Sequence, residues 1–257
     1  MNNNFIPADA AALASRIPES YTALVVQTTG STNNDILDMQ RRGETSHTVL
    51  VAHTQVSGKG RLGRSFSSAP GGIYFSFNIS LPASDERARL RLTPLAGLAA
   101  AETLHSLYAL DVRIKWVNDL ILGGKKLCGI LAESVIIGDT LHAVVGIGIN
   151  ACNTDFPDTA TSISRHTDAT IDANDVIGGT VTRFISRLPN ISDDSVIDEY
   201  KSLSTVIGHE VTVHAFDGSP DYTATAVDID RDCSLIIRAD GELRRLSSGE
   251  VSVRAVT

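Results

Sequence analysis

Residues 112–150 read VRIKWVNDLILGGKKLCGILAESVIIGDTLHAVVGIGIN, and this stretch decides the fold class. Apolar and β-branched residues recur over 112–116, 120–122, 127–137 and 141–150, which predicts four strands. The dipeptides Gly123-Gly124 and Gly138-Asp139 separate the last three of these strands, and such dipeptides are typical of tight hairpin turns. The stretch therefore predicts an antiparallel meander.

The rest of the first two hundred residues predicts two more strands, over 48–55 and 72–81, and several helices. A short helix starts at Ser31 and stops at Gly43, and two amphipathic helices are expected over 172–188 and 195–203. A further helix opens at Thr93-Pro94 with proline at its first position, and it is apolar nearly all round. Such a helix is buried, so we expect an α+β fold in which helices pack against the sheet.

Beyond residue 207 the pattern changes to five short alternating runs separated by Gly, Asp and Pro, which predicts a small β-barrel. We place a domain boundary there, with a main domain over 1–207 and a C-terminal β module over 208–257. About 50 residues are marginal as an independent domain, so the module is expected to dock on the main domain.

The composition excludes several classes of protein. The 257 residues hold 22 Lys plus Arg and 30 Asp plus Glu, so the net charge is 22 − 30 = −8, which argues against nucleic-acid binding. Three scattered cysteines give no disulfide framework, and the N-terminus does not resemble a signal peptide. The most apolar stretch, 92–110, is interrupted by Glu102 and His105 and is too short for a membrane span. We expect a soluble cytoplasmic protein without a membrane partner.

The loop SGKGRLGRSFSSAPGG at 57–72 carries the strongest chemical signal. It matches GxGxxG formally, but no helix can start easily after it, and no Walker sequence occurs in the chain. Glycines that let the backbone approach a ligand, together with Lys59, Arg61 and Arg64, predict a flexible cationic clamp for a phosphate or carboxylate. The alternative is an exposed basic loop that serves solubility.

Two other clusters have polar or small residues in strands. Lys115 and the Asn118-Asp119 pair stand near a hairpin that carries Lys126, so these groups could converge on one pocket, although a solvated hairpin would also use them. In residues 145–150, VGIGIN, small side chains leave room on one face, which indicates a close ligand approach or, alternatively, a bulge or helix crossing.

The residues Gly30-Ser31-Thr32-Asn33, Gln55 followed by GKGRLGR, KWVND, KKLCGILAE and GIGIN occur here in the order seen in biotin protein ligases, and nearly the whole chain resembles that family. The chain departs from the family pattern at three positions. Val117 replaces a proline and is expected to loosen the turn, Phe66 replaces a tryptophan, and His53 replaces an acidic residue.

This resemblance implies a class II synthetase-like fold with a mixed, mostly antiparallel sheet and an SH3-like C-terminal barrel. Because only about 20 to 30 residues precede the motifs, too few for a helix-turn-helix, we expect the short form without a DNA-binding domain.

The resemblance also implies a two-step reaction. Biotin attacks the α-phosphate of ATP to give biotinyl-5′-AMP, and a lysine of a biotin carboxyl carrier protein, from acetyl-CoA carboxylase or a related carboxylase, then takes the biotinyl group. Mg²⁺ accompanies ATP, and neither a metal held by the protein alone nor a prosthetic group is expected; a homodimer is left open. Fixed cations are needed to bring two anions together, and neutral polar groups suit the ureido ring.

The implied site residues fall into three groups. The catalytic residues are Lys126, Arg61 and Asp119. Biotin is expected to contact Ser31, Thr32, Asn33, Gln55, Lys59, Gly60, Arg61 and Lys126, and the nucleotide to contact Gly58, Arg61, Arg64, Phe66, Asn118, Asp119, Lys126 and Asn150. The division of roles among Lys115, Asn118 and Asp119 stays open.

Two other functions remain as alternatives. A lipoate or octanoyl ligase has a related fold and also acylates a carrier lysine, but its region corresponding to the basic glycine loop reads differently. A biotin-sensing protein without turnover would not need Lys126, Arg61 and Asp119 together. The sequence therefore favours the enzyme.

Overall fold

A seven-stranded sheet forms the centre of the computed structural model, which describes residues 4–44, 46–215, 220–247 and 251–255. All neighbouring strands pair antiparallel except β2 and β3, which are parallel. The α+β class with a mixed, mostly antiparallel sheet is thus confirmed. In spatial order the strands are β2 (Tyr21–Thr29), β3 (His47–Gln55), β4 (Ile73–Pro82), β8 (Thr140–Ile149), β7 (Lys125–Ile137), β6 (Asp119–Leu122) and β5 (Arg113–Lys115).

The predicted meander corresponds to β5 through β8. Gly123 and Gly124, at φ of 56° and 76°, form the turn between β6 and β7, and Gly138, at φ of 60°, forms the turn between β7 and β8. Glycine adopts this left-handed backbone without a Cβ clash, which is why two residues suffice to reverse the chain. β7 and β8 then pair along ten positions, from Cys128↔Ile149 to Ile137↔Thr140.

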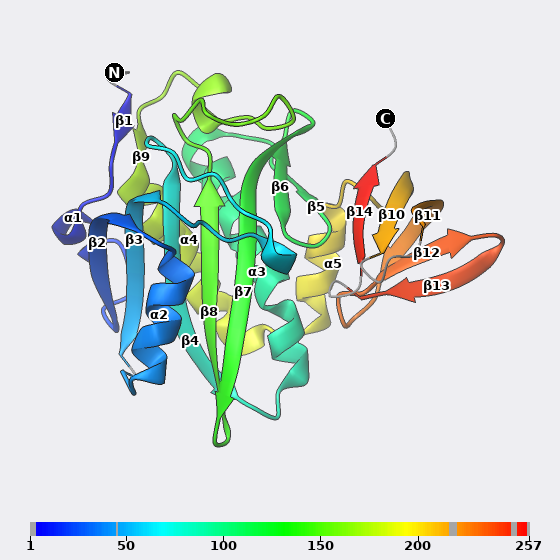
Figure 1. The fold of residues 1–257 in the computed structure, drawn as a ribbon, viewed down its shortest axis with the longest axis horizontal. Coiled ribbons are helices and arrows are strands. Elements are labelled where there is room, and N and C mark those ends of the chain that lie inside the picture. The colour runs from blue at the N-terminus through cyan, green and yellow to red at the C-terminus, as the bar shows by residue number, and fades with distance from the viewer. Residues whose placement is uncertain (1–3, 45, 216–219, 248–250, 256–257) are drawn as a thin grey trace.

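Helices cover both faces of this sheet (Figure 1). α3 (Glu86–Tyr108) and α4 (Ala173–Arg187) lie on one face, and α2 (Thr32–Arg41) lies on the other, where Ile36 and Leu37 pack on Leu50 and Val144. α1 (Ala10–Ala14) precedes β2, and α5 (Asp194–Ser202) leads to the C-terminal module.

The predicted start of α3 is wrong. The helix begins at Glu86, where Asp85 caps it by accepting a hydrogen bond from the Ala88 amide, and Pro94 lies inside it. Proline removes one backbone hydrogen bond there. The burial of Ala88 and Leu92 on the first turns outweighs that loss, because both side chains are at most 1% exposed.

Short elements complete the main body. β1 (Phe5–Ile6) pairs with β9 (Ile171–Asp172) in parallel, which ties the N-terminal segment to the start of α4. Three single turns of 3₁₀ helix are η1 (Arg61–Gly63), η2 (Ile163–Arg165) and η3 (Leu188–Asn190).

Each of the five predicted C-terminal runs forms a strand of one antiparallel sheet. In spatial order they are β13 (Glu242–Leu246), β12 (Leu235–Ala239), β11 (Tyr222–Ile229), β10 (Glu210–Ala215) and β14 (Val251–Ala255). This small sheet stands beside α5 (Figure 1), in agreement with an SH3-like C-terminal module. We keep residue 207 as the proposed boundary between the two domains.

The C-terminal module is docked on the main body through a buried arginine. Arg91 of α3 is 0% exposed. Its guanidinium donates hydrogen bonds to the carbonyls of Ile191, Asp193 and Arg231, and to the Asp194 carboxylate at 2.9 Å. A buried charge is tolerated only with this many partners. The arginine thus joins α3, the start of α5 and the module at one point.

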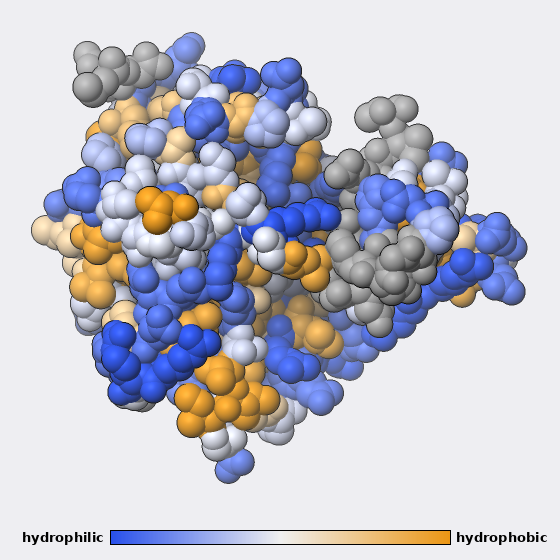
Figure 2. Space-filling view, in the orientation of Figure 1, coloured by the Kyte–Doolittle hydropathy of each residue, from blue (hydrophilic) through white to orange (hydrophobic). Residues whose placement is uncertain are grey.

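One part of the surface is apolar. Figure 2 shows an apolar patch over the end of the β7–β8 hairpin, where Ile136 and Ile137 are 53% and 50% exposed. Within the described ranges, none of the helices combines the length and apolar character needed to cross a bilayer.

Candidate active site

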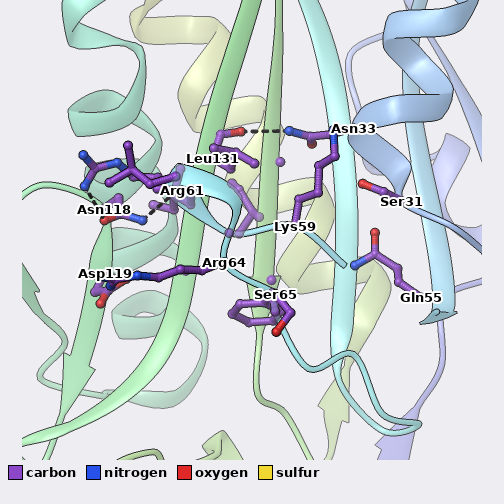
Figure 3. Close-up of a pocket in the computed structure, with 18 of the residues that line it drawn as sticks. Ser31, Asn33, Gln55, Lys59, Arg61, Arg64, Ser65, Asn118, Asp119 and Leu131 are labelled. Atoms are coloured by element: carbon purple, nitrogen blue, oxygen red, sulfur yellow. Dashed lines mark hydrogen bonds between the residues drawn. The ribbon is translucent and has the colours of Figure 1, made fainter. Parts of the chain in front are cut away.

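A cavity of about 170 Å³ lies on the α2 side of the sheet, beneath the loop that follows β3. Figure 3 shows its polar side chains, which come from both sides of the pocket. Its walls include twelve of the predicted site residues: Ser31, Thr32, Asn33, Gln55, Lys59, Gly60, Arg61, Arg64, Phe66, Asn118, Asp119 and Lys126. The five sequence motifs therefore meet at one place, although they lie as far apart as Ser31 and Gly148 in the chain.

The basic glycine loop is a tight hairpin over residues 58–66. The Phe66 amide donates to the Gly58 carbonyl at 2.8 Å, the Gly60 amide donates to the Arg64 carbonyl at 2.7 Å, and Lys59 pairs with Ser65 between them. A Cβ on Gly58 would stand 2.4 Å from the Phe66 carbonyl oxygen, so the hairpin can close only with glycine there. The loop thus has regular backbone pairing, which its glycine content alone does not predict.

Neutral polar groups line one end of the cavity. The Gln55 carbonyl oxygen accepts from the Thr32 amide at 2.9 Å, and the Gln55 amide donates to the Ser68 hydroxyl at 2.9 Å. The Thr32 hydroxyl lies 2.6 Å from the hydroxyl of Ser76, which is fully buried on β4. These bonds fix hydroxyl and amide groups that suit a small, uncharged polar ring.

Asn33 anchors this end of the cavity from behind. Its carbonyl oxygen accepts from the Ser76 hydroxyl at 2.6 Å, and its amide donates to the Leu131 carbonyl at 3.2 Å and the Glu133 carboxylate at 2.9 Å. Both latter partners are acceptors only, which sets the orientation of the amide. Gly146 makes room for it, because a Cβ there would lie 2.0 Å from the Asn33 oxygen.

Charged groups gather at the opposite end (Figure 3). The Lys126 ammonium lies 2.7 Å from the Asp119 carboxylate, and the Arg61 guanidinium donates to the Asn118 carbonyl oxygen at 3.2 Å. Burial lowers the pKa of Arg61 and the nearby Asp119 charge opposes this, so the guanidinium stays charged at neutral pH. Two cations therefore face the cavity near one carboxylate.

Phe66 lies flat against the sheet beside these charges. A Cβ on Gly148 would lie 2.6 Å from its ring and one on Gly129 would lie 3.0 Å away, so the ring occupies the space that two strand glycines leave. The Lys126 ammonium stands 5.9 Å from the ring centroid, and Tyr74 meets the ring edge-on. The glycines of the GIGIN strand thus make room for two site side chains, Asn33 and Phe66.

Two predicted residues do not line the cavity. Gly58 is buried at the base of the hairpin, and the Asn150 carbonyl oxygen accepts from the Asn153 amide at 3.0 Å.

The KWVND segment was expected to be loosened by Val117, but hydrogen bonds hold it on both sides. The Tyr200 hydroxyl donates to the Val117 carbonyl at 2.9 Å, and the Trp116 indole donates to the Cys233 carbonyl at 2.9 Å.

Sequence reasoning missed four polar residues of this region: Ser65, which lines the cavity, and Ser68, Ser76 and Glu133. The signal was present for Ser76, because strand alternation in residues 73–80 places it opposite the apolar positions, on the face that carries the cavity. Glu133 has the same relation to Gly129 and Leu131 on β7, which both line the cavity.

Cys128 has no part in this chemistry. Its side chain is fully buried, and burial raises the pKa of the thiol far above neutral, so it fills the core as expected. Among the described residues, no three His, Cys, Asp or Glu side chains gather closely enough to hold a metal ion.

Comparisons with known proteins agree with this arrangement. The Biotin/lipoate A/B protein ligase family model matches residues 25–150, and the Biotin protein ligase C terminal domain model matches residues 206–254. The chain is 30% identical over 236 residues to a biotin–[acetyl-CoA-carboxylase] ligase of Mycobacterium tuberculosis, which covers 88% of this chain and 87% of that protein.

Two further relatives extend the comparison. A bifunctional ligase/repressor BirA of Salmonella typhimurium is 29% identical over 247 residues, covering 92% of this chain and 76% of that protein. Biotin protein ligase from Aquifex aeolicus, solved in complex with biotin and ATP, superposes with a TM-score of 0.76 at 27% identity, covering 91% of this chain and 99% of that one. This chain therefore belongs to the biotin protein ligase family.

Proposed function

We propose that this protein joins biotin to ATP, forming biotinyl-5′-AMP and pyrophosphate, and then transfers the biotinyl group to a lysine of a carrier protein. The observation that carries this proposal is the polarity of a single cavity. Neutral groups of Thr32 and Gln55 lie at one end, where the Lys59 ammonium stands 4.0 Å from Glu133, and the Arg61 and Lys126 cations lie at the other. Biotin has the matching polarity, with an uncharged ureido ring at one end and a carboxylate at the other.

At the neutral end, the ureido ring needs acceptors for two N–H groups and a donor for one carbonyl. The Thr32 and Ser31 hydroxyls and the Gln55 amide supply both kinds of group at the cavity wall. Asn33 donates to both Leu131 and Glu133 and so uses both of its N–H groups, whereas Gln55 donates to Ser68 alone; we therefore assign Asn33 to holding the strand rather than to the main ligand contacts.

At the charged end, the biotin carboxylate oxygen attacks the α-phosphorus, an acyl–phosphate bond forms, and pyrophosphate leaves. Both reactants are anions, so the step requires fixed positive charge. Lys126 is held by Asp119 at 2.7 Å when no anion is present. An entering carboxylate or phosphate competes with Asp119 for the ammonium, and Arg61 supplies a second cation from the hairpin. Mg²⁺ enters as part of the nucleotide substrate.

In the second step, the amine of the acceptor lysine attacks the biotinyl carbonyl, an amide forms, and AMP leaves with the acyl–phosphate electrons. The amine must lose protons. We assign Asp119, once it is released from Lys126, to accept a proton from the amine or to orient the amine. Phe66 stands beside these groups, where an aromatic face can cover the adenine.

The carrier is proposed to be the biotin carboxyl carrier domain of acetyl-CoA carboxylase or a related carboxylase. The cytoplasm is proposed as the compartment, because free thiols are stable there. Self-association stays open and is decided by the molar mass in solution.

The decisive experiment is biotin-dependent exchange of labelled pyrophosphate into ATP. Exchange with biotin and none with lipoate is the expected result. The alternative of a lipoate or octanoyl ligase requires the reverse, and a biotin sensor requires binding without exchange. The match of the C-terminal module to a biotin protein ligase domain supports biotin.

A further inference from the structure

Glu133 stands behind the cavity wall and contacts two elements, α2 and the hairpin over residues 58–66. One carboxylate oxygen accepts from the Asn33 amide of α2 at 2.9 Å, and the other lies 4.0 Å from the Lys59 ammonium of the hairpin. Its side chain is 30% exposed and does not line the cavity itself. Glu133 ends the KKLCGILAE motif, yet the proposed reaction assigns no role to a carboxylate at this position.

Charged side chains attach the hairpin over residues 58–66 to the body, and two of these contacts matter here. Arg61, near its tip, bonds Asn118, and Lys59, at its base, meets Glu133 (Figure 3 shows Arg61 and Lys59 on their separate sides). With the hairpin in this position the cavity measures about 170 Å³, whereas pockets for ligands of biotin-like or larger size measure about 300 Å³ or more. Movement of the hairpin away from the body would widen the cavity for biotin and ATP.

We propose that Glu133 is a positioning residue that holds the hairpin down over the pocket through Lys59, and so sets how fast bound biotin and biotinyl-AMP leave. Asn33 fixes the carboxylate from the other side, so that Glu133 offers Lys59 a stationary partner. The part of this inference that concerns biotin rests on the proposed function; the part that concerns the hairpin does not.

Glu133→Gln removes the charge and keeps the volume and an oxygen acceptor for Asn33, so the variant is expected to fold. The first measurement needs no ligand. Trypsin cleavage after Arg61 and Arg64, followed by mass spectrometry, reports how often the hairpin leaves the body. We expect this cleavage to be about two- to fivefold faster than in the unmodified protein, because a partly exposed ion pair stabilises a contact by no more than about that factor.

The second measurement uses Trp116, the only tryptophan of the chain, which lines the cavity. Stopped-flow fluorescence is expected to show biotin dissociating about two- to fivefold faster from Glu133→Gln. The maximal rate of pyrophosphate exchange at saturating biotin and ATP should stay within about twofold, because Lys126, Arg61 and Asp119 are untouched. Glu102→Gln is the matched control: its carboxylate pairs with Arg183 and Arg187 far from the hairpin, so both rates should stay unchanged.

A double-mutant cycle with Lys59→Met separates the ion pair from general loosening. If the Lys59–Glu133 ion pair holds the hairpin to the body, the double variant is cleaved no faster than either single variant. The proposal would be overturned if the rate increases of the two single variants multiplied in the double variant. It would also be overturned if the Glu133→Gln protein were as resistant to trypsin as the control. Faster cleavage without any fluorescence response to biotin would support this role of the ion pair and refute the proposed function instead.

Discussion

Gly148→Ala is the substitution that separates the two halves of the pocket most cleanly. A Cβ at this position would lie 2.6, 2.9 and 3.2 Å from three atoms of the Phe66 ring. Contacts between carbon atoms are favourable only at about 3.5–4.0 Å, so the ring must move by about 1 Å. Tyr74 meets the ring on one side at a centroid distance of 6.3 Å, which leaves the cavity as the direction of movement.

The expected cost follows from this displacement. Forcing an extra methyl group into a packed site costs about 1–3 kcal/mol. If the whole cost is expressed in nucleotide binding, it corresponds to about a five- to 150-fold weaker affinity, since about 1.4 kcal/mol is a factor of ten. Biotin affinity should change by less than about twofold, because the Thr32 and Gln55 groups do not touch the ring.

The assay combines isothermal titration with biotin and the KM for ATP in pyrophosphate exchange. Gly146→Ala is the matched comparison on the same strand. Its Cβ would lie 2.0 Å from the Asn33 oxygen, so it should weaken biotin binding and spare ATP. Equal effects of Gly148→Ala on biotin and ATP, or an unchanged KM for ATP, would refute the assignment of Phe66 to the nucleotide.

Four other outcomes are expected. Lys126→Ala should lower adenylate formation by about 100-fold or more while biotin binding stays measurable, and unchanged pyrophosphate release would contradict its role. Arg61→Gly should release more free biotinyl-AMP; retention equal to the unmodified protein would show that the hairpin cation does not hold the adenylate. Arg91→Ala should lower the free energy of unfolding by about 3–5 kcal/mol in urea titration, since the carbonyls of Ile191, Asp193 and Arg231 lose their buried donor; a loss under about 1 kcal/mol would contradict this. Cys128 should resist iodoacetamide at pH 8 until the protein unfolds, because burial raises its pKa; rapid alkylation of the native protein would contradict it.

The strands of the meander and of the C-terminal module could be predicted because their signals are local. Alternation over residues 127–137 and the Gly138-Asp139 turn specify both strand and register within a few residues. The start of the helix around Pro94 was predicted less accurately than the strands. Proline at the first helical position is common, whereas the Asp85 cap that starts α3 is a single weak signal.

The sequence pattern could not predict which strands and side chains that are distant in the chain contact each other. β2 (Tyr21–Thr29) was not predicted. Its parallel pairing with β3 follows from the crossover through α2, and the residues of the two strands do not indicate this pairing. Glu133 was missed for a similar reason. A partly exposed carboxylate within a strand is ordinary until the fold brings Asn33 and Lys59 to it.

The central claim is that one cavity holds biotin and ATP so that they react and the product stays bound. It is tested most directly by incubating the protein with labelled biotin and ATP, passing it through a desalting column, and identifying the label that elutes with the protein. The account predicts about one biotinyl-5′-AMP per chain, formed only when ATP is present and lost in Lys126→Ala. Labelled biotin that elutes unmodified, in equal amount with and without ATP, would contradict it.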